Sequence, residues 1–174
     1  MGIVCDTNRF LYSVNSKTFA LVSDLMKKYK INIEDLYRKV YAKPLSELRL
    51  FGHLATTLKV DKNGFGYAML DDELLSSFNT DVSAPSNMIN DFNNINDVNV
   101  WTFVTFDSKT GLYRVNIRSR GPVINEIAAL HGGGGHKFAS GVRTTSREEV
   151  DSLLKDLSEC AKKYKEKGDK NGSD

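Results

Sequence analysis

The segment HGGGGHKFASG, from His131 to Gly141, combines four consecutive glycines with a histidine that directly follows them. Glycine has no Cβ, so the backbone of Gly132–Gly135 can approach a phosphate or a base closely, and its N–H groups can surround an anion. His136 can donate a hydrogen bond to a phosphate oxygen. The alternative is a turn after a helix, because glycine commonly ends helices. Four glycines followed by a histidine favour ligand binding, although no Gly-Lys-Ser/Thr follows as in a Walker A loop.

A second group of polar side chains lies in RVNIRSRG, residues 114–121. In a strand, alternate residues point to the same face, so Arg114, Asn116 and Arg118 share one face and the aliphatic residues between them share the other. A guanidinium group donates in a planar fork that suits phosphate oxygens. We predict a ligand contact for Arg118, near the strand end, and a solvated position for Arg114.

The segment CDTNRF, residues 5–10, contains a carboxylate, Asp6, which we place in a loop after a buried strand that ends at Ile3–Val4. A carboxylate in such a loop can bind a hard metal ion, but a single aspartate can equally cap a turn. No DxD or His-His pair occurs, and His53 and His131 are isolated in the sequence. The residues by themselves therefore do not predict a site for two metal ions.

The composition is that of an ordinary globular protein: 174 residues, 40% hydrophobic and 26% charged, with a formal net charge of +2. So small a net charge argues against a broad surface for long duplex DNA, while a few arginines can still bind a short nucleotide. Cys5 and Cys160 form no CxxC or zinc-like spacing, so we expect free thiols. We see no apolar run of membrane-spanning length and no signal peptide, and therefore expect a cytoplasmic protein without a membrane partner.

The period of the hydrophobic residues changes along the chain. Up to about residue 58 they recur at helical spacing, with Ser16 and Asn32 as candidate N-caps, and alternating patterns between turn residues follow. The predicted helices are 16–29, 33–41, 44–58, a short helix from 71, 85–93, 123–130 and 146–164, and the predicted strands are 58–60, 65–70, 99–106, 112–118 and 138–143.

This order of elements predicts an α/β fold. Residues 1–43 form a helical N-terminal segment, and residues 44–165 form a mixed sheet flanked by helices. Residues 166–174 are charged and contain glycine, so we predict a disordered tail there.

Two segments, GIVCDTNRF and VNIRSRGPVINEIAALHGGGGHKFASG, together with the helices between them, resemble DHH phosphoesterases that carry a DHHA1 domain. The resemblance covers about Gly2 to Leu157 and is strongest to the bacterial oligoribonuclease/pAp-phosphatase (nanoRNase) type. The Gly-rich motif is specific to DHHA1 domains, and Asp-Thr-x-Arg-Phe is typical of the nanoRNase group. The resemblance implies that residues 1–43 end a DHH catalytic domain and that residues 44–165 form a DHHA1 substrate-binding domain.

The resemblance also implies roles for individual residues. In that family two Mn²⁺ ions serve phosphoester hydrolysis, and Asp6 would be one of their ligands. The residues implied to bind substrate are Arg118, Ser119, Gly133, Gly134, Gly135 and His136. The family's other metal motifs, a DxD-type segment and an Asp-His-His triplet, do not occur here, and we expect them upstream of Met1. We therefore expect a substrate-binding C-terminal part that is incomplete for catalysis by itself.

The function that the resemblance implies is hydrolysis of short oligoribonucleotides, pAp or both, with Mn²⁺ as cofactor and short RNA or nucleotide phosphates as partners. A cyclic-dinucleotide phosphodiesterase, which resembles the family in the same two domains, is one alternative. A non-catalytic RNA- or nucleotide-binding DHHA1 module is another. The sequence leaves the oligomeric state open, a homodimer included.

Overall fold

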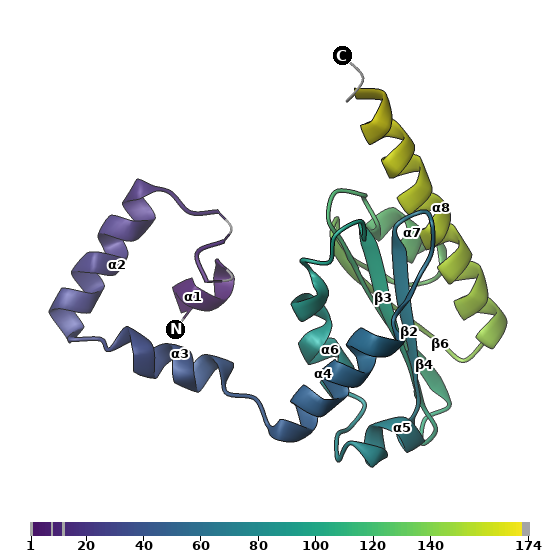
Figure 1. Cartoon of the computed structure of the whole chain (residues 1–174), viewed down its shortest axis with the longest axis horizontal. Coiled ribbons are helices and arrows are strands. Elements are labelled where there is room, and N and C mark those ends of the chain that lie inside the picture. Colours follow the sequence, from purple (N-terminus) through teal and green to yellow (C-terminus); the bar gives the residue numbers. More distant parts are fainter. Residues whose placement is uncertain (1, 8, 12, 172–174) are drawn as a thin grey trace. The chain divides into compact units, whose positions relative to one another are not determined.

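A computed structural model describes residues 2–7, 9–11 and 13–171. The chain divides into two compact units, residues 1–44 and 45–174. In Figure 1 the first unit is coloured purple to blue and the second blue to yellow.

The first unit is helical throughout its regular elements: α1 (Gly2–Asp6), α2 (Ser16–Tyr29) and α3 (Ile33–Tyr41). The predicted strand ending at Ile3–Val4 is wrong, because these residues lie in α1. A strand without a neighbouring strand leaves its backbone groups unpaired, whereas a helical turn pairs them locally. The Thr7 N–H accordingly donates to the Ile3 carbonyl at 3.0 Å.

Asparagine side chains cap the starts of α2 and α3. The Asn15 side chain accepts from the Thr18 N–H at 3.1 Å, and the Thr18 hydroxyl accepts from the Asn15 N–H, which completes a capping box. Ser16, the predicted cap, is instead the first helical residue. Asn32 caps α3 as predicted, because its side chain accepts from two N–H groups of the first turn.

The second unit is built on a six-stranded sheet with the strand order β1-β2-β3-β4-β6-β5. The β2–β3 pair is parallel and the other pairs are antiparallel, so the sheet is mixed and the predicted α/β class is confirmed. The strands are β1 (Lys59–Val60), β2 (Phe65–Leu70), β3 (Val100–Asp107), β4 (Leu112–Ser119), β5 (Gly134–His136) and β6 (Ala139–Thr144). The helices are α4 (Leu45–Thr57), α5 (Asp72–Ser77), α6 (Ala84–Met88), the 3-10 helix η1 (Ile89–Phe92), α7 (Asn125–Leu130) and α8 (Arg147–Asn171).

Two segments of this unit differ from the prediction. Gly134–His136 form the strand β5 within a segment that we expected to be a loop, because residues without a Cβ can pair closely with β6. Helix α8 continues to Asn171, so residues 166–171 are helical rather than part of a disordered tail. Lysine and glutamate, which are frequent there, are good helix formers. Residues 172–174 of the predicted tail lie outside the described residues.

Helices pack on both faces of the sheet, and each face has its own apolar core. On one face, α4, α5, α6 and η1 bury Trp101 and Phe103 of β3. On the other face, α7 and α8 bury Val115 and Ile117 of β4, among other residues. Figure 1 shows the two helical layers on either side of the sheet. The Trp101 indole N–H donates to the Ile89 carbonyl at 2.9 Å, so this buried polar group is satisfied.

Both cysteines are free thiols, as expected from their spacing. Burial raises the pKa of the Cys160 thiol, and nearby Lys163 only partly opposes this effect. The Cys160 thiol is therefore protonated and unreactive at neutral pH. None of the helices in the part of the chain that the structure describes combines the length and apolarity needed to cross a membrane.

Candidate functional site

Helices cover only half of the first face of the sheet. Trp101 and Phe103 of β3 pair directly with Arg118 and Asn116 of β4, and directly paired residues point to the same face. The two β3 side chains are buried under helices, whereas Arg118 and Asn116 are only partly buried. We call the part of this face over β4, β6 and β5 the open half. Apart from Leu112 at the start of β4, its side chains are polar or very small.

The strand register arranges the open half in three rows that run across the strands. Neighbouring rows are two residues apart along β4, about 6.6 Å, because alternate residues share a face. The Arg118 row contains Arg118, Ala139 and His136; the Asn116 row contains Asn116, Gly141 and Gly134; and the Arg114 row contains Arg114 and Arg143. The fold therefore brings the predicted residues Arg118 and His136 onto one row.

A cavity of about 430 Å³ lies over the Asn116 and Arg114 rows. Its polar lining residues are Ser83, Ser86, Arg114, Asn116 and Arg143, and Gly132, Gly133 and Gly141 also line it. Such a hollow, with a few convergent donors, is typical of a binding site for a small polar ligand. Arg114, which we predicted to be solvated, is thus part of the cavity wall.

Neighbouring residues hold Arg118 in place beside this cavity. Its Nε donates to the Asn90 side chain of η1 at 2.9 Å, and its Nη1 donates to the Ile117 carbonyl at 2.9 Å. Burial lowers the pKa of Arg118, but a guanidinium group remains charged at neutral pH. The other donors of its guanidinium group remain for a ligand.

A buried carboxylate fixes Arg114. The Arg114 Nη2 donates to Asp107 Oδ2 at 2.9 Å, and the Asp107 side chain is only 7% exposed. The hydrogen bond from Arg114, together with one from Thr110, holds the pKa of Asp107 below its ordinary value. Asp107 is therefore ionised at neutral pH and orients the guanidinium group along the cavity wall. The Arg114 Nε is buried and has no hydrogen-bond partner among the described residues.

The glycines of the Gly-rich segment have different structural roles. Gly132 has a φ of +72°, which suits the residue that follows a helix end. A Cβ on Gly133 would lie 2.2 Å from the Gly141 carbonyl oxygen, so only glycine fits there. A Cβ on Gly134, in contrast, would meet no heavy atom within 4 Å and would point over the open half. Gly134 therefore leaves space for a ligand, whereas Gly133 lets β5 approach β6.

The structure does not form the predicted nest of successive N–H groups around an anion. The Gly132 N–H donates to the Ala129 carbonyl at 3.1 Å, and the Gly133 N–H donates to the Ala128 carbonyl at 2.7 Å. These groups are used because the last carbonyls of α7 lack partners within the helix. Gly135 lies in β5, paired with Ser140 of β6. The segment thus favours a ligand by its lack of side chains rather than by free N–H groups.

Ser119, which the resemblance implied to bind substrate, lies on the opposite face from Arg118. Its side chain is buried, and its hydroxyl donates to the Pro122 carbonyl at 2.6 Å. The reason is strand alternation, since consecutive residues of β4 point to opposite faces. Its hydroxyl therefore stabilises the turn after β4.

His131 is a supporting residue that the sequence did not reveal. Its Nδ1 lies 2.6 Å from a Glu149 carboxylate oxygen, and its Nε2 lies 2.9 Å from an Asp156 carboxylate oxygen. Burial by itself would lower its pKa, but the hydrogen bonds and charges of the two acids outweigh this effect and raise the pKa of His131. A doubly protonated ring donates to both acids and ties the start of the Gly-rich segment to α8. The two acids follow His131 by 18 and 25 residues in the sequence, so the local sequence gave no signal of this contact.

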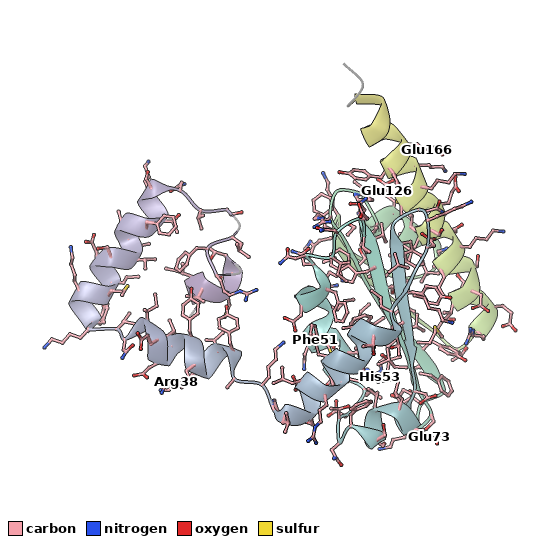
Figure 2. All side chains as sticks on the ribbon, in the orientation of Figure 1. Arg38, Phe51, His53, Glu73, Glu126 and Glu166 are labelled. Atoms are coloured by element: carbon pink, nitrogen blue, oxygen red, sulfur yellow. The ribbon has the colours of Figure 1, made fainter. Side chains whose placement is uncertain are left out.

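His53 has a packing role instead. Its ring, on α4 in Figure 2, lies 5.2 Å from the ring of Phe78. Phe78 in turn packs against the first core. We therefore exclude His53 from the candidate site.

Asp6 ends α1 in the first unit and is exposed. Across residues 2–7, 9–11 and 13–171, no group of three or more histidine, cysteine, aspartate or glutamate side chains could hold a metal ion. Two Mn²⁺ ions need several carboxylate or imidazole ligands. The donors present in the described residues therefore do not fit a complete two-metal site, and no catalytic step can be assigned to them.

The comparisons with known proteins agree with this architecture. A family model for the DHHA1 domain matches residues 64–163, more than half of the chain. The chain belongs to the DHHA1 family. The matched range of the DHHA1 domain includes all three rows of the open half and the residues that line the cavity.

Curated relatives match nearly the whole chain, both the DHHA1 domain and most of the residues outside it. A probable bifunctional oligoribonuclease and PAP phosphatase NrnA of Streptococcus mutans is 35% identical and covers 92% of this chain. The bifunctional oligoribonuclease and PAP phosphatase NrnA of Bacillus subtilis is 32% identical over 94% of this chain. These matches cover only 52% and 51% of the relatives, so the chain spans about half the length of the curated relatives it matches. The predicted family resemblance is confirmed.

A solved structure has the same fold. An exopolyphosphatase-related protein from Bacteroides fragilis superposes with a TM-score of 0.80 at 28% sequence identity. The match covers 92% of this chain and 49% of that one. The mixed α/β fold of this chain is thus shared with a solved relative.

Proposed function

We propose that this chain is the substrate-binding part of a phosphoesterase that hydrolyses short oligoribonucleotides, pAp or both. The observation that carries the proposal is the open half of the sheet, where Arg118 and His136 share one row. Ala139 lies between them in this row, and its small methyl group leaves space above the sheet for a ligand. A guanidinium group and an imidazole group on either side of this space suit a bound phosphate. The names of the relatives, oligoribonuclease and PAP phosphatase, support the same class of substrate.

Hydrolysis in the proposed enzyme would depend on Mn²⁺, which would supply an activated water and stabilise negative charge on the phosphate. Asp6 would be one metal ligand. Since the described residues offer no further cluster of ligands, we expect this chain by itself to bind RNA without cleaving it. Isothermal titration calorimetry of the chain with MnCl₂ tests the metal proposal, with Asp6→Asn as the comparison. A heat of Mn²⁺ binding that the wild-type chain shows and that this substitution leaves unchanged would remove Asp6 from the proposed metal site.

The binding proposal is tested by fluorescence anisotropy of the full chain with a labelled RNA trinucleotide, without metal. We expect Arg118→Ala and His136→Ala each to weaken binding by about tenfold or more, because each removes a charge-assisted or polar contact to phosphate. Arg147→Ala is the matched control, since Arg147 is on α8, pairs with Asp151 and does not line the cavity.

The outcomes separate clearly. Binding that Arg118→Ala and His136→Ala weaken and that Arg147→Ala leaves unchanged supports the proposal. Binding that responds equally to all three substitutions would indicate nonspecific electrostatic attraction. No binding by the wild-type chain would reject a substrate-binding role for the open half in this chain.

A further inference from the structure

The Arg114 row lies two rows from the Arg118 row, and the proposed phosphate site does not use it. Arg114 and Arg143 are direct partners across β4 and β6, so their side chains rise next to each other from the same face. Both line the cavity of about 430 Å³. Two cations side by side on a sheet repel each other unless an anion lies close to them.

The charges of this row are only half compensated. Arg114 pairs with Asp107 at 2.9 Å. Arg143 is exposed, and no acidic group pairs with it in the part of the chain that the structure describes. Arg147, another exposed arginine of this unit, does have a partner, Asp151, at 3.1 Å. The row therefore keeps a net positive charge at the edge of a cavity.

The space between the two arginine-containing rows can admit a polar chain. Gly141 and Gly134 present no side chains in the middle row, and the Asn116 amide there can both donate and accept hydrogen bonds. Ser83 and Ser86 line the same cavity. Hydroxyl and amide groups of this kind suit ribose hydroxyls and base edges rather than an apolar ligand.

We infer that Arg143, together with Arg114, forms a second phosphate subsite, so that this domain binds an oligoribonucleotide with at least three successive phosphates along the three rows. The inference rests on the proposed function of the Arg118 row as a first phosphate subsite. Asp107 is a positioning residue in this subsite, because it orients Arg114 without facing the RNA.

The distance between the rows decides the length of the ligand. Arg118 and Arg114 are four residues apart along β4, which corresponds to about 13 Å. In pAp a single ribose separates the two phosphates, which is too short to bridge that distance. A trinucleotide with a 5′-phosphate carries phosphates on both sides of two riboses and can reach both arginine-containing rows. The second subsite therefore discriminates oligoribonucleotides from pAp.

The test is a competition experiment with the full chain and a fluorescently labelled RNA pentanucleotide. Unlabelled 5′-phosphorylated trinucleotide and pAp compete separately against the probe. We expect Arg143→Ala to weaken the trinucleotide about tenfold and pAp less than twofold, because only the longer ligand reaches this row. Arg118→Ala should weaken both competitors, and Arg147→Ala should weaken neither.

Salt dependence gives a second, independent readout. Removal of one phosphate contact should reduce the slope of log K against log salt by about 0.7 for single-stranded RNA. We expect this reduction for Arg143→Ala with the pentanucleotide and no change for Arg147→Ala. Thermal unfolding of each variant verifies that the fold persists, and the exposed position of Arg143 makes its loss tolerable.

The results distinguish the inference from the proposed function. If Arg118→Ala weakens both ligands while Arg143→Ala leaves the trinucleotide unchanged, the first subsite stands and the second is rejected. Equal weakening of pAp and trinucleotide by Arg143→Ala also overturns it, because the row would then not select for length. If the wild-type chain binds neither ligand, the proposed function itself fails, and the inference fails with it.

Discussion

The two halves of one sheet face differ in how far their side chains are buried. Over β2 and β3, Trp101 and Phe103 are fully buried by α4, α5, α6 and η1. Over β4 and β6, the residues paired with them or next in line are Asn116 and Arg118, which are only partly buried, and Arg143, which is exposed. Helices packed on one half of the face stabilise the fold, and the polar side chains of the open half remain accessible to a ligand.

The largest contrast is expected between Trp101→Ala and Arg118→Ala. Trp101→Ala should lower the free energy of unfolding by about 3–5 kcal/mol, because it leaves a cavity under the helices and removes the bond to Ile89. Arg118→Ala should cost about 1 kcal/mol while it weakens RNA binding. Urea denaturation measures both. Similar losses of stability for the two variants would mean that the open half is as important to folding as the covered half.

Two neighbouring glycines at the start of β5 test the same contrast between a closely packed position and an open one. Gly133→Ala should destabilise the protein by about 1–3 kcal/mol, because the added Cβ would meet the Gly141 carbonyl, which is backbone and cannot swing away. Gly134→Ala should change stability by less than about 0.5 kcal/mol, because its Cβ enters open space. It should nevertheless weaken trinucleotide binding, since that space belongs to the open half. Thermal unfolding and anisotropy measured on the same samples separate the two effects.

The His131 contact predicts how pH affects the support of the open half. The folded-state pKa of His131 is raised, so its contribution to stability is complete below the unfolded value of about 6.5 and is lost as pH rises through the folded value. We expect about 1 kcal/mol from the paired imidazolium, visible as a decline in unfolding free energy as pH rises above the unfolded pKa of His131. His131→Gln should flatten this part of the curve. An unchanged decline in that variant would assign the effect to another group.

The smallest effect should come from Asp107, whose folded-state pKa is lowered by Arg114. Its contribution is present above its unfolded pKa and is lost as pH falls through the lower folded value. The wild-type protein should therefore lose stability in acid more steeply than Asp107→Asn, as followed by urea denaturation between neutral and acidic pH. In the trinucleotide competition, the same variant should weaken binding less than Arg143→Ala does, because it loosens Arg114 without removing a cation.

The accuracy of the sequence-based predictions depended on how local the deciding interactions are. The neighbouring strands 58–60 and 65–70 and the cap at Asn32 were predicted correctly, because turn residues and caps act on their immediate neighbours. The strand at Ile3–Val4 failed, because a buried strand is defined by neighbours that a short apolar pair does not specify. Strand β5 was missed, because glycines carry no pattern of alternation, and only the register with β6 reveals it.

The same reasoning applies to the candidate site. Alternation along β4 correctly placed Arg114, Asn116 and Arg118 on one face, since it depends only on the strand period. Alternation applied equally to Ser119, which is consequently on the other face, although the family resemblance had implied a substrate contact. The partners of His131 could not be predicted, because the two acids come from α8 and meet it only in the folded domain.

The sequence by itself determined the glycine-rich segment, the arginines on one strand face and the order of most helices and strands, because each follows from residue type and local spacing. The tertiary structure alone decided which arginine of β4 lines the cavity, since η1 contacts Arg118 while Arg114 lines the cavity together with Ser86 of α6. It also decided that the rows of β4 continue onto β6 and β5, because strand register depends on hydrogen bonds between segments that are distant in sequence.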